Sequence, residues 1–211
     1  ISKGHTVIGT GRRQEKLDEL QTQLGDKFIP LNFDVSDLPA TKTALQTLPT
    51  DLRNHIDVLV NNAGLALGLE PADKTDFADW QQMVNTNILG LIHLTHEILP
   101  FMVANNDGYI INLSSTAGNY PYFGGNVYGA TKAFVTQFSL NLRADLVGKN
   151  IRVSNIEPGL CGGTEFSNIR FHGDDAKAAQ VYDSVQYVTP QDIANMVAWL
   201  IEQPKHVNIN R

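Results

Sequence analysis

The feature of this sequence that most limits its fold is the alternation of short apolar runs with longer segments of helical period. The runs are rich in Ile, Val, Leu and Phe, and apolar residues recur every three or four positions between them. This alternation is typical of βαβ units, whose parallel sheet carries helices on both faces. It predicts an α/β fold with a doubly wound parallel sheet in three αβα layers. We expect strands at residues 5–8, 28–34, 56–60, 109–113, 151–156 and 207–209.

The predicted helices lie between these strands, and nothing divides the chain into domains. Repeats, linkers and low-complexity segments are absent from its 211 residues, so we expect one domain over residues 1–211. Gly-rich residues 158–175 form the longest irregular stretch, which is typical of a functional loop. Helices are expected after Arg13, where Leu17, Leu20 and Leu24 share a face, and at residues 38–48, 79–104, 126–147 and 190–199.

Composition excludes several classes of function. The net charge of -6 gives no basic field for a phosphate backbone, so we expect no nucleic-acid partner. Cys161 is the only cysteine, which excludes an internal disulfide and favours a reducing cytoplasm. No signal peptide is recognisable, and no apolar run approaches the roughly 20 residues that span a bilayer. We therefore expect a cytoplasmic protein without a membrane partner.

The N-terminal stretch "ISKGHTVIGTGRR" lacks an expected element. A doubly wound nucleotide-binding sheet normally begins with a central strand and a Gly-rich turn that faces the pyrophosphate. Here Lys3 and Gly4 look like the end of a helix that precedes them. We expect that the polypeptide starts earlier and that this chain lacks the first strand and its glycine turn.

Tyr128 and Lys132, in "VYGATKAF", are the first candidates for chemistry. Spaced at i and i+4, they share one face of a helix. An ammonium close to a phenol lowers the phenol pKa from its reference value of about 10. Such a phenol is a usable acid and base near neutral pH. Such a pair also arises by chance on a helix, so the pair alone decides nothing.

Polar residues at predicted strand ends accompany this pair. Ser115 follows the strand "YIINL" by two residues and precedes Tyr128 by 13 residues, and ligands bind at the carboxyl ends of such strands. Residues 61–64, "NNAG", end another strand, where small residues permit close approach of a ligand. Asn87 is a polar residue on an apolar helical stripe and needs partners if it is buried. The alternatives are two ordinary turns and an interior amide that the backbone satisfies.

Taken in order, "NNAG", "NILG", "SS", Y-x-x-x-K and "EPG" resemble the short-chain dehydrogenase/reductase family over essentially the whole chain. This resemblance implies a Rossmann-type fold and an oxidoreductase. Tyr128 is then the general acid and base, and Lys132 lowers its pKa and holds the nicotinamide ribose. Ser115 binds the substrate oxygen, and Asn87 supports a water-linked proton path.

The same resemblance implies which residues bind the cofactor. Family members that prefer NAD usually carry an acid where this chain has Arg12 and Arg13, and a guanidinium fork matches a 2′-phosphate. NADP(H) is therefore the expected cofactor, although both arginines could be solvated charges at a helix start. The other expected contacts are Asp34 and Val35 at the adenine, Asn61, Ala63 and Gly64 on the cofactor floor, and Pro158, Gly159 and Thr164 beside the carboxamide.

The stretch "IEPGLCGGTEFSNIRFHGDD" resembles the substrate loop of the bacterial NADP-dependent 3-hydroxy acid dehydrogenases in that family. The resemblance implies oxidation of serine, L-allo-threonine and related 3-hydroxy acids, or reduction of malonic semialdehyde. Arg170 is the candidate to bind the substrate carboxylate in a bidentate manner. The alternatives are a reductase of neutral ketones or acyl thioesters on the same scaffold, and a catalytically idle NADP-binding regulator. The family often forms homotetramers through its two long helices.

Metal binding has little support in the sequence. His93 and His96 are spaced at i and i+3, whereas helical zinc sites use i and i+4, and no third ligand presents itself. We therefore expect no metal. Cys161 lies among glycines without a base nearby in the sequence, so we interpret it as a small loop residue.

Overall fold

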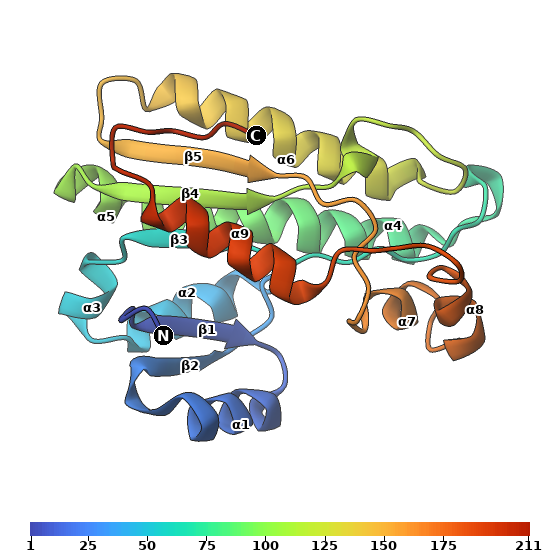
Figure 1. The fold of residues 1–211 in the computed structure, drawn as a ribbon, viewed down its shortest axis with the longest axis horizontal. Coiled ribbons are helices and arrows are strands. Elements are labelled where there is room, and N and C mark those ends of the chain that lie inside the picture. The colour runs from blue at the N-terminus through green and yellow to red at the C-terminus, as the bar shows by residue number, and fades with distance from the viewer. The chain divides into compact units, whose positions relative to one another are not determined.

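Figure 1 shows a computed structural model that describes residues 1–211. The chain folds into two compact units, Ile1–His55 and Ile56–Arg211. All pairing between strands is parallel, as the alternation of runs predicted, and helices flank the strands. The strands form two ladders, one in each unit. The expectation of one domain over residues 1–211 stays a prediction.

In the first unit, β1 (Val7–Gly11) pairs in parallel with β2 (Phe28–Asn32). Helix α1 (Gln14–Leu24) connects the two strands and packs on both. Gly9 is required here because a Cβ atom at this position would lie 2.3 Å from the Phe28 ring. The remaining elements of this unit are η1 (Gly25–Lys27), α2 (Leu38–Thr47) and α3 (Thr50–Asn54).

The second unit contains a parallel sheet in the order β3 (Val58–Asn61), β4 (Gly108–Leu113) and β5 (Ile151–Ile156). Every residue of β4 is buried, as is typical of a central parallel strand that is covered on both faces. Three asparagines, Asn61, Asn112 and Asn155, lie opposite one another near the carboxyl ends of these strands. Each strand therefore contributes one asparagine near this end of the sheet.

Helices cover the two faces of this three-stranded sheet. On one face, Tyr109, Ile111 and Leu113 form a core cluster with Leu200 of α9 (Pro190–Glu202), the red helix in Figure 1. On the other face, Asn112 donates to Ser139 of α6 (Asn126–Asp145) at 2.9 Å. Helix α5 (Leu91–Asn105) packs beside β3 and β4. The shorter elements are η2 (Ala72–Lys74), η4 (Thr116–Gly118), α7 (Phe166–Arg170) and α8 (Asp175–Gln180).

The long helix expected at residues 79–104 is present but not uniform. Helix α4 (Phe77–Val84) continues through one π-turn, η3 (Asn85–Gly90), into α5. By length and composition alone this stretch, Phe77–Asn105, could cross a membrane, which the apolar runs of the sequence did not indicate. In the structure it packs on β3, β4 and α6, and Met83, Thr95 and Ile98 are buried.

The strand expected at residues 207–209 is wrong. The Asn208 side chain replaces a backbone acceptor in this segment, so no regular ladder with β5 forms. The amide of Val153 donates to the Asn208 side chain at 3.0 Å, and the Ser154 hydroxyl donates to the carbonyl of Ile209. The expected irregular stretch 158–175 is also partly helical, because it contains α7.

Candidate active site

Tyr128 and Lys132 lie in the first half of α6, and both are buried. The Tyr128 ring packs in a core cluster with Leu65, Leu67 and Met83 and meets the Phe166 ring edge-on at 6.0 Å. The Lys132 Nζ atom donates to the carbonyl of Leu113, the last residue of β4, at 2.9 Å. It lies 5.9 Å from the centre of the Tyr128 ring. The two side chains therefore share one environment at the carboxyl end of β4.

The expected lowering of the Tyr128 pKa by Lys132 is wrong for this structure. Burial raises the pKa of Tyr128 to about 12, partly offset by Ser115 and by the positive charge of Arg170. Burial also lowers the pKa of Lys132 to about 8. Burial therefore shifts both groups toward their neutral forms, since desolvation penalises whichever form carries charge. The sequence showed the spacing of the pair but not its burial.

Ser115 lies beside this pair because two glycines let η4 pack directly on α6. A Cβ atom on Gly118 would lie 2.8 Å from the backbone of Lys132 and Ala133, and one on Gly129 would lie 2.9 Å from the Ala117 carbonyl oxygen. The Ser115 hydroxyl accepts from the amide of Ala117 at 3.1 Å. Sequence reasoning missed this role of the glycines, although small residues in both "SSTAG" and "YGATK" were the available signal.

Ser114 is a second residue that the sequence patterns did not single out. It is buried, and its hydroxyl donates to the carbonyl of Lys132 at 2.7 Å. It also lies 3.0 Å from the Thr136 hydroxyl. Ser114 thus ties the end of β4 to α6 one residue before Ser115, which faces the site.

The Asn87 side chain is fully engaged inside the protein. It is 1% exposed, lies in the π-turn, accepts from the Leu65 amide at 2.9 Å and donates to the Leu65 carbonyl at 2.8 Å. Its second amide hydrogen goes to Thr131 at 3.0 Å. These contacts match the alternative that the sequence left open, an interior amide satisfied largely by backbone. No side-chain N–H of Asn87 remains to donate to water.

The three residues expected on the cofactor floor differ in exposure. A Cβ atom on Gly64 would lie 3.3 Å from Lys132 Nζ and 3.4 Å from Asn87 Oδ1, so only a glycine leaves these two atoms unobstructed. Ala63 is exposed. Asn61 is buried and donates to Thr95 and Asn112, which makes it part of the core beneath the floor.

The segment that follows β5 borders the same site. The Pro158 carbonyl accepts from the Ser115 hydroxyl at 3.3 Å and from the Thr116 amide at 3.0 Å. No atom lies within 4 Å of the position that a Cβ on Gly159 would take, so a ligand can approach the backbone there. Thr164 is exposed, and its hydroxyl accepts from the Phe166 amide at the start of α7.

Arg170, at the end of α7, reaches the Tyr128 phenol. Its Cζ atom lies 5.8 Å from the centre of the Tyr128 ring and 5.5 Å from that of Tyr122. Its Nη2 donates to the Tyr122 hydroxyl at 2.9 Å, and its Nε donates to the Gly68 carbonyl at 3.0 Å. The structure therefore brings together Ser115, Tyr128, Lys132 and Arg170.

The other expected cofactor contacts belong to the first unit. The Arg12 side chain is 57% exposed, and its Nη1 lies 3.5 Å from the Asp34 carboxylate. Burial by itself raises the pKa of the Asp34 carboxyl. Two hydrogen bonds from Ser36 and the charge of Arg12 lower this pKa by more than burial raises it, so it lies below its ordinary value. Val35 is buried, and Arg13 is exposed at the N-cap of α1.

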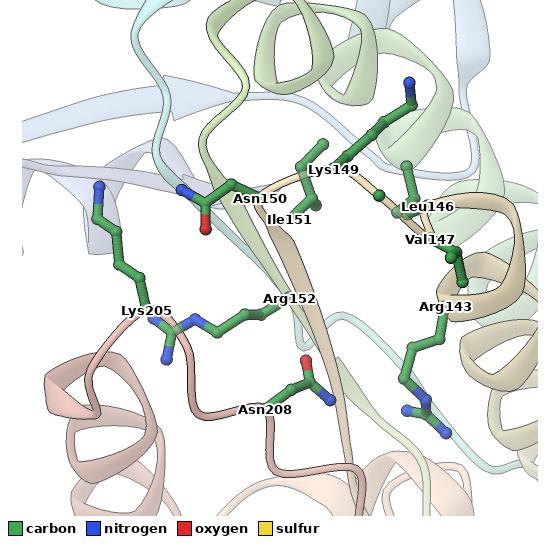
Figure 2. A pocket seen from close by; sticks show the side chains of 10 residues that line it. Arg143, Leu146, Val147, Lys149, Asn150, Ile151, Arg152, Lys205 and Asn208 are labelled. Atoms are coloured by element: carbon green, nitrogen blue, oxygen red, sulfur yellow. The ribbon is translucent and has the colours of Figure 1, made fainter.

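Outside this cluster, the structure shows neither a group of metal ligands nor a pocket with unengaged catalytic side chains. No three His, Cys, Asp or Glu side chains form a group that could hold a metal ion. Figure 2 shows a pocket lined by cationic side chains where α6 leads into β5. Arg152 there donates to carbonyls of Leu200, Gln203 and Val207, and Lys205 pairs with Asp107. These cations are engaged in holding the C-terminal segment.

A comparison with known protein families establishes the family of this chain. The short chain dehydrogenase profile matches residues 1–174. The chain belongs to the short chain dehydrogenase family. The order of "NNAG", the Ser115 segment and the Tyr128–Lys132 pair, which indicated this family in the sequence, is thereby explained.

Named relatives within the family align with the whole chain. A probable NADP-dependent dehydrogenase of Haemophilus influenzae is 66% identical over 211 residues, which are all of this chain and 83% of that protein. The NADP-dependent 3-hydroxy acid dehydrogenase YdfG of Escherichia coli (strain K12) is 56% identical and aligns with 100% of this chain and 84% of its own length. A solved structure described as the closed form of serine dehydrogenase complexed with NADP+ has a TM-score of 0.97 and 56% identity, and the match covers 99% of this chain and 84% of that one.

Proposed function

We propose that this chain is an NADP(H)-dependent oxidoreductase that interconverts 3-hydroxy acids and their carbonyl forms. The substrate class is that of serine, allo-threonine and 3-hydroxypropionate or malonic semialdehyde. The observation that carries the proposal is the convergence of Ser115, Tyr128 and Lys132 beside the cation of Arg170. The names of the relatives, which specify NADP and 3-hydroxy acids, support the same substrate class.

In this proposal Tyr128 moves the proton of the reaction. Bound NADP(H) supplies the hydride donor or acceptor, while the phenol gives a proton to the carbonyl oxygen or takes one from the alcohol. Ser115, which interacts with the phenol, turns its hydroxyl hydrogen from the Pro158 carbonyl to the same substrate oxygen. The raised pKa of about 12 keeps Tyr128 protonated at neutral pH, which suits the direction of reduction.

The N–H donors of Lys132 that lack an acceptor in the protein support the proposed cofactor. An ammonium has three N–H donors, and the buried Lys132 uses one of them on Leu113. A buried ammonium with unmet donors is costly, so the hydroxyls of a ribose are suitable partners. In this proposal Lys132 therefore holds the nicotinamide ribose. The residues present fit this part of the cofactor.

The remaining cofactor contacts are proposed from chemistry and exposure. The exposed, loosely paired guanidinium of Arg12, with Arg13, suits a 2′-phosphate, and Asp34 and Val35 suit the adenine. Ala63 and Gly64 form the floor above the buried Asn61. Pro158, Gly159 and Thr164 border the nicotinamide, since the backbone at Gly159 is open to a ligand.

Asn87 is proposed to support proton transfer through the backbone of its π-turn and not through its side chain. Its side-chain hydrogens are already donated to Leu65 and Thr131, so its side chain cannot pass a proton. The π-turn displaces the regular backbone bonding around it, which is a frequent feature of functional helices. A water-linked path would then use a backbone carbonyl of this turn.

Arg170 is proposed to bind the substrate carboxylate, because its guanidinium lies 5.8 Å from the Tyr128 ring and can bind a carboxylate bidentately. The test compares Arg170→Ala with the unaltered protein on a 3-hydroxy acid. We expect KM to rise at least ~10-fold, since a charge-assisted hydrogen bond is lost. An unchanged KM contradicts this role.

Two alternatives make different predictions in a substrate panel. A reductase of neutral ketones or acyl thioesters would turn over those compounds faster than malonic semialdehyde. An idle NADP-binding regulator would bind cofactor but give no change in the absorbance of reduced nicotinamide with any substrate. The proposal requires turnover of 3-hydroxy acids with NADP+ at a higher kcat/KM than with NAD+.

We also propose a cytoplasmic homotetramer in which residues 1–211 act as one domain with a substrate loop at 158–175. Support for the location comes from Cys161, whose thiol is free.

Support for the assembly comes from α6, where Leu140 is 46% exposed and Phe134 stacks on Phe138 at 5.8 Å. Light scattering tests the assembly, and a monomer at micromolar concentration contradicts it. Nucleic acid and membrane have no part in this proposal.

A further inference from the structure

Three loops that follow adjacent strands meet at Arg170. They are residues 65–70 after β3, 119–125 after β4 and 158–175 after β5. Gly124, at φ 73°, lies so close to Leu69 that a Cβ would be 2.2 Å from the Leu69 carbonyl oxygen. The Gly68 amide donates to the Arg170 carbonyl at 2.8 Å. The backbone therefore fixes all three loops against one another around this one side chain.

The guanidinium of Arg170 uses its Nε and one N–H of Nη2 to contact the protein, which leaves its other N–H groups available. Its Nε donates to the Gly68 carbonyl, and one hydrogen of Nη2 goes to the Tyr122 hydroxyl. A guanidinium has five N–H donors, so three remain on Nη1 and Nη2 without a protein partner. Two of these donors, one on Nη1 and one on Nη2, can form the end of the fork, the edge that can bind a carboxylate with two parallel hydrogen bonds.

Tyr122 adds a second kind of donor at the same place. Because its oxygen accepts from Arg170 Nη2, its own hydroxyl hydrogen is free to be donated elsewhere. The side chain is 38% exposed, so a ligand can reach it. Tyr122 and Arg170 also both act electrostatically on the Tyr128 phenol, which shows that their polar ends lie near the proposed proton donor.

We propose that the Tyr122 hydroxyl and the Nη1–Nη2 edge of Arg170 together form the site for the substrate carboxylate. This inference rests on the proposed function, and it assigns Tyr122 as a specificity-determining residue. The Gly68 carbonyl orients the fork by occupying Nε. A neutral substrate leaves these donors without an acceptor, and a site built to hydrogen-bond a group discriminates strongly against an analogue that lacks it.

The test uses Tyr122→Phe and two substrates, a 3-hydroxy acid and its methyl ester. The quantity measured is the ratio of kcat/KM for the acid to kcat/KM for the ester. We expect the ratio to fall about tenfold, because one hydrogen bond to a charged group is lost. The change should appear in KM for the acid more than in kcat, since the carboxylate does not react.

Tyr120→Phe is the matched control. It is the same substitution in the same loop, at a side chain that is 72% exposed and makes no hydrogen bond to Arg170. Its ratio should equal that of the unaltered protein. The double variant Tyr122→Phe/Arg170→Gln should lose less than the product of the two single losses, because both residues bind one carboxylate. Thermal unfolding of each variant verifies that it folds.

The outcomes separate this inference from the proposed function. If the unaltered protein prefers the acid and Tyr122→Phe keeps its ratio, the role of Tyr122 is overturned while the proposed function stands. Independent, fully multiplicative losses in the double variant also overturn the shared site. If the unaltered protein oxidises the ester as well as the acid, both the proposed function and this inference fail.

Discussion

The Lys132 ammonium lies 5.9 Å from the centre of the Tyr128 ring and donates to the carbonyl of Leu113 at 2.9 Å. This bond anchors the lysine to the end of β4, directly before the Ser114–Ser115 segment. One helical turn of α6 thus carries a phenol and an amine at the carboxyl end of β4, where we propose that the substrate oxygen and the nicotinamide ribose bind. The packing of η4 on α6 holds Ser115 beside them.

Gly118→Ala should disrupt this packing. The new Cβ would lie 2.8 Å from the backbone of Lys132 and Ala133, which cannot yield like a flexible side chain. We expect a loss of about 1–3 kcal/mol in the free energy of unfolding, as for other overpacked positions, together with a lower kcat. Urea denaturation measures the first effect. Gly11→Ala is the control, since its Cβ would make an ordinary 3.8 Å contact with Leu17; equal losses in both variants contradict the packing argument.

Ser115→Ala and Ser114→Ala should separate chemistry from positioning. Ser115→Ala removes a proposed donor to the reacting oxygen and should lower kcat about 100-fold. Ser114→Ala removes the hydrogen bond to the Lys132 carbonyl, which should cost roughly 1 kcal/mol of stability and less than about tenfold in kcat. Steady-state kinetics and urea denaturation of both variants provide the comparison. A larger loss of kcat for Ser114→Ala reverses the assignment.

Lys132→Met should change how stability depends on pH. Burial lowers the Lys132 pKa from 10.5 to about 8, so between these values the unfolded chain binds a proton that the folded protein has released. The stability of the unaltered protein therefore rises with pH in this window relative to the variant, by up to about 3 kcal/mol. Urea denaturation without cofactor at about pH 7 and about pH 10 measures the difference. The exposed Lys149→Met is the control, and a pH-independent difference for Lys132→Met contradicts the lowered pKa of Lys132.

Arg12→Ala should reduce the preference for the phosphorylated cofactor. If Arg12 binds the 2′-phosphate, KM for NADPH should rise at least ~10-fold, whereas KM for NADH, which lacks that phosphate, should change little. Lys16→Ala is a suitable control because it removes a nearby cation, in the first turn of α1, that pairs with Glu19 at 2.9 Å. Unchanged discrimination between the two cofactors in Arg12→Ala means that Arg12 is a solvated charge.

The sequence was a good guide where a local pattern decides the outcome. The strand at Ile151–Ile156 and the start of α6 at Asn126 were predicted at their observed positions, because apolar runs and helical spacing are local properties. The i and i+4 spacing also placed Tyr128 and Lys132 on one face. By contrast, the direction of the Tyr128 pKa depends on burial among Leu65, Met83 and Phe166, which are distant in sequence.

Other features were invisible for the same reason. The strand predicted at residues 207–209 failed because Asn208 supplies a side-chain acceptor where a strand would supply a carbonyl. The close approach of Gly118 and Gly129 and the anchoring bond of Ser114 arise only when η4 meets α6. The position of Arg170 was a hypothesis from charge alone, and its contacts to Tyr122 and Gly68 required the fold.

The pH dependence of oxidation, compared between the unaltered protein and Tyr128→Phe, tests the role of the phenol most directly. In the proposed mechanism oxidation needs the phenolate, and with a pKa of about 12 its fraction should grow about tenfold per pH unit across the alkaline range. We predict that kcat/KM for a 3-hydroxy acid rises with pH in the unaltered protein. In Tyr128→Phe it should be lower by at least ~10²-fold and nearly independent of pH. Near-normal turnover by Tyr128→Phe, with the same rise, would show that another group moves the proton.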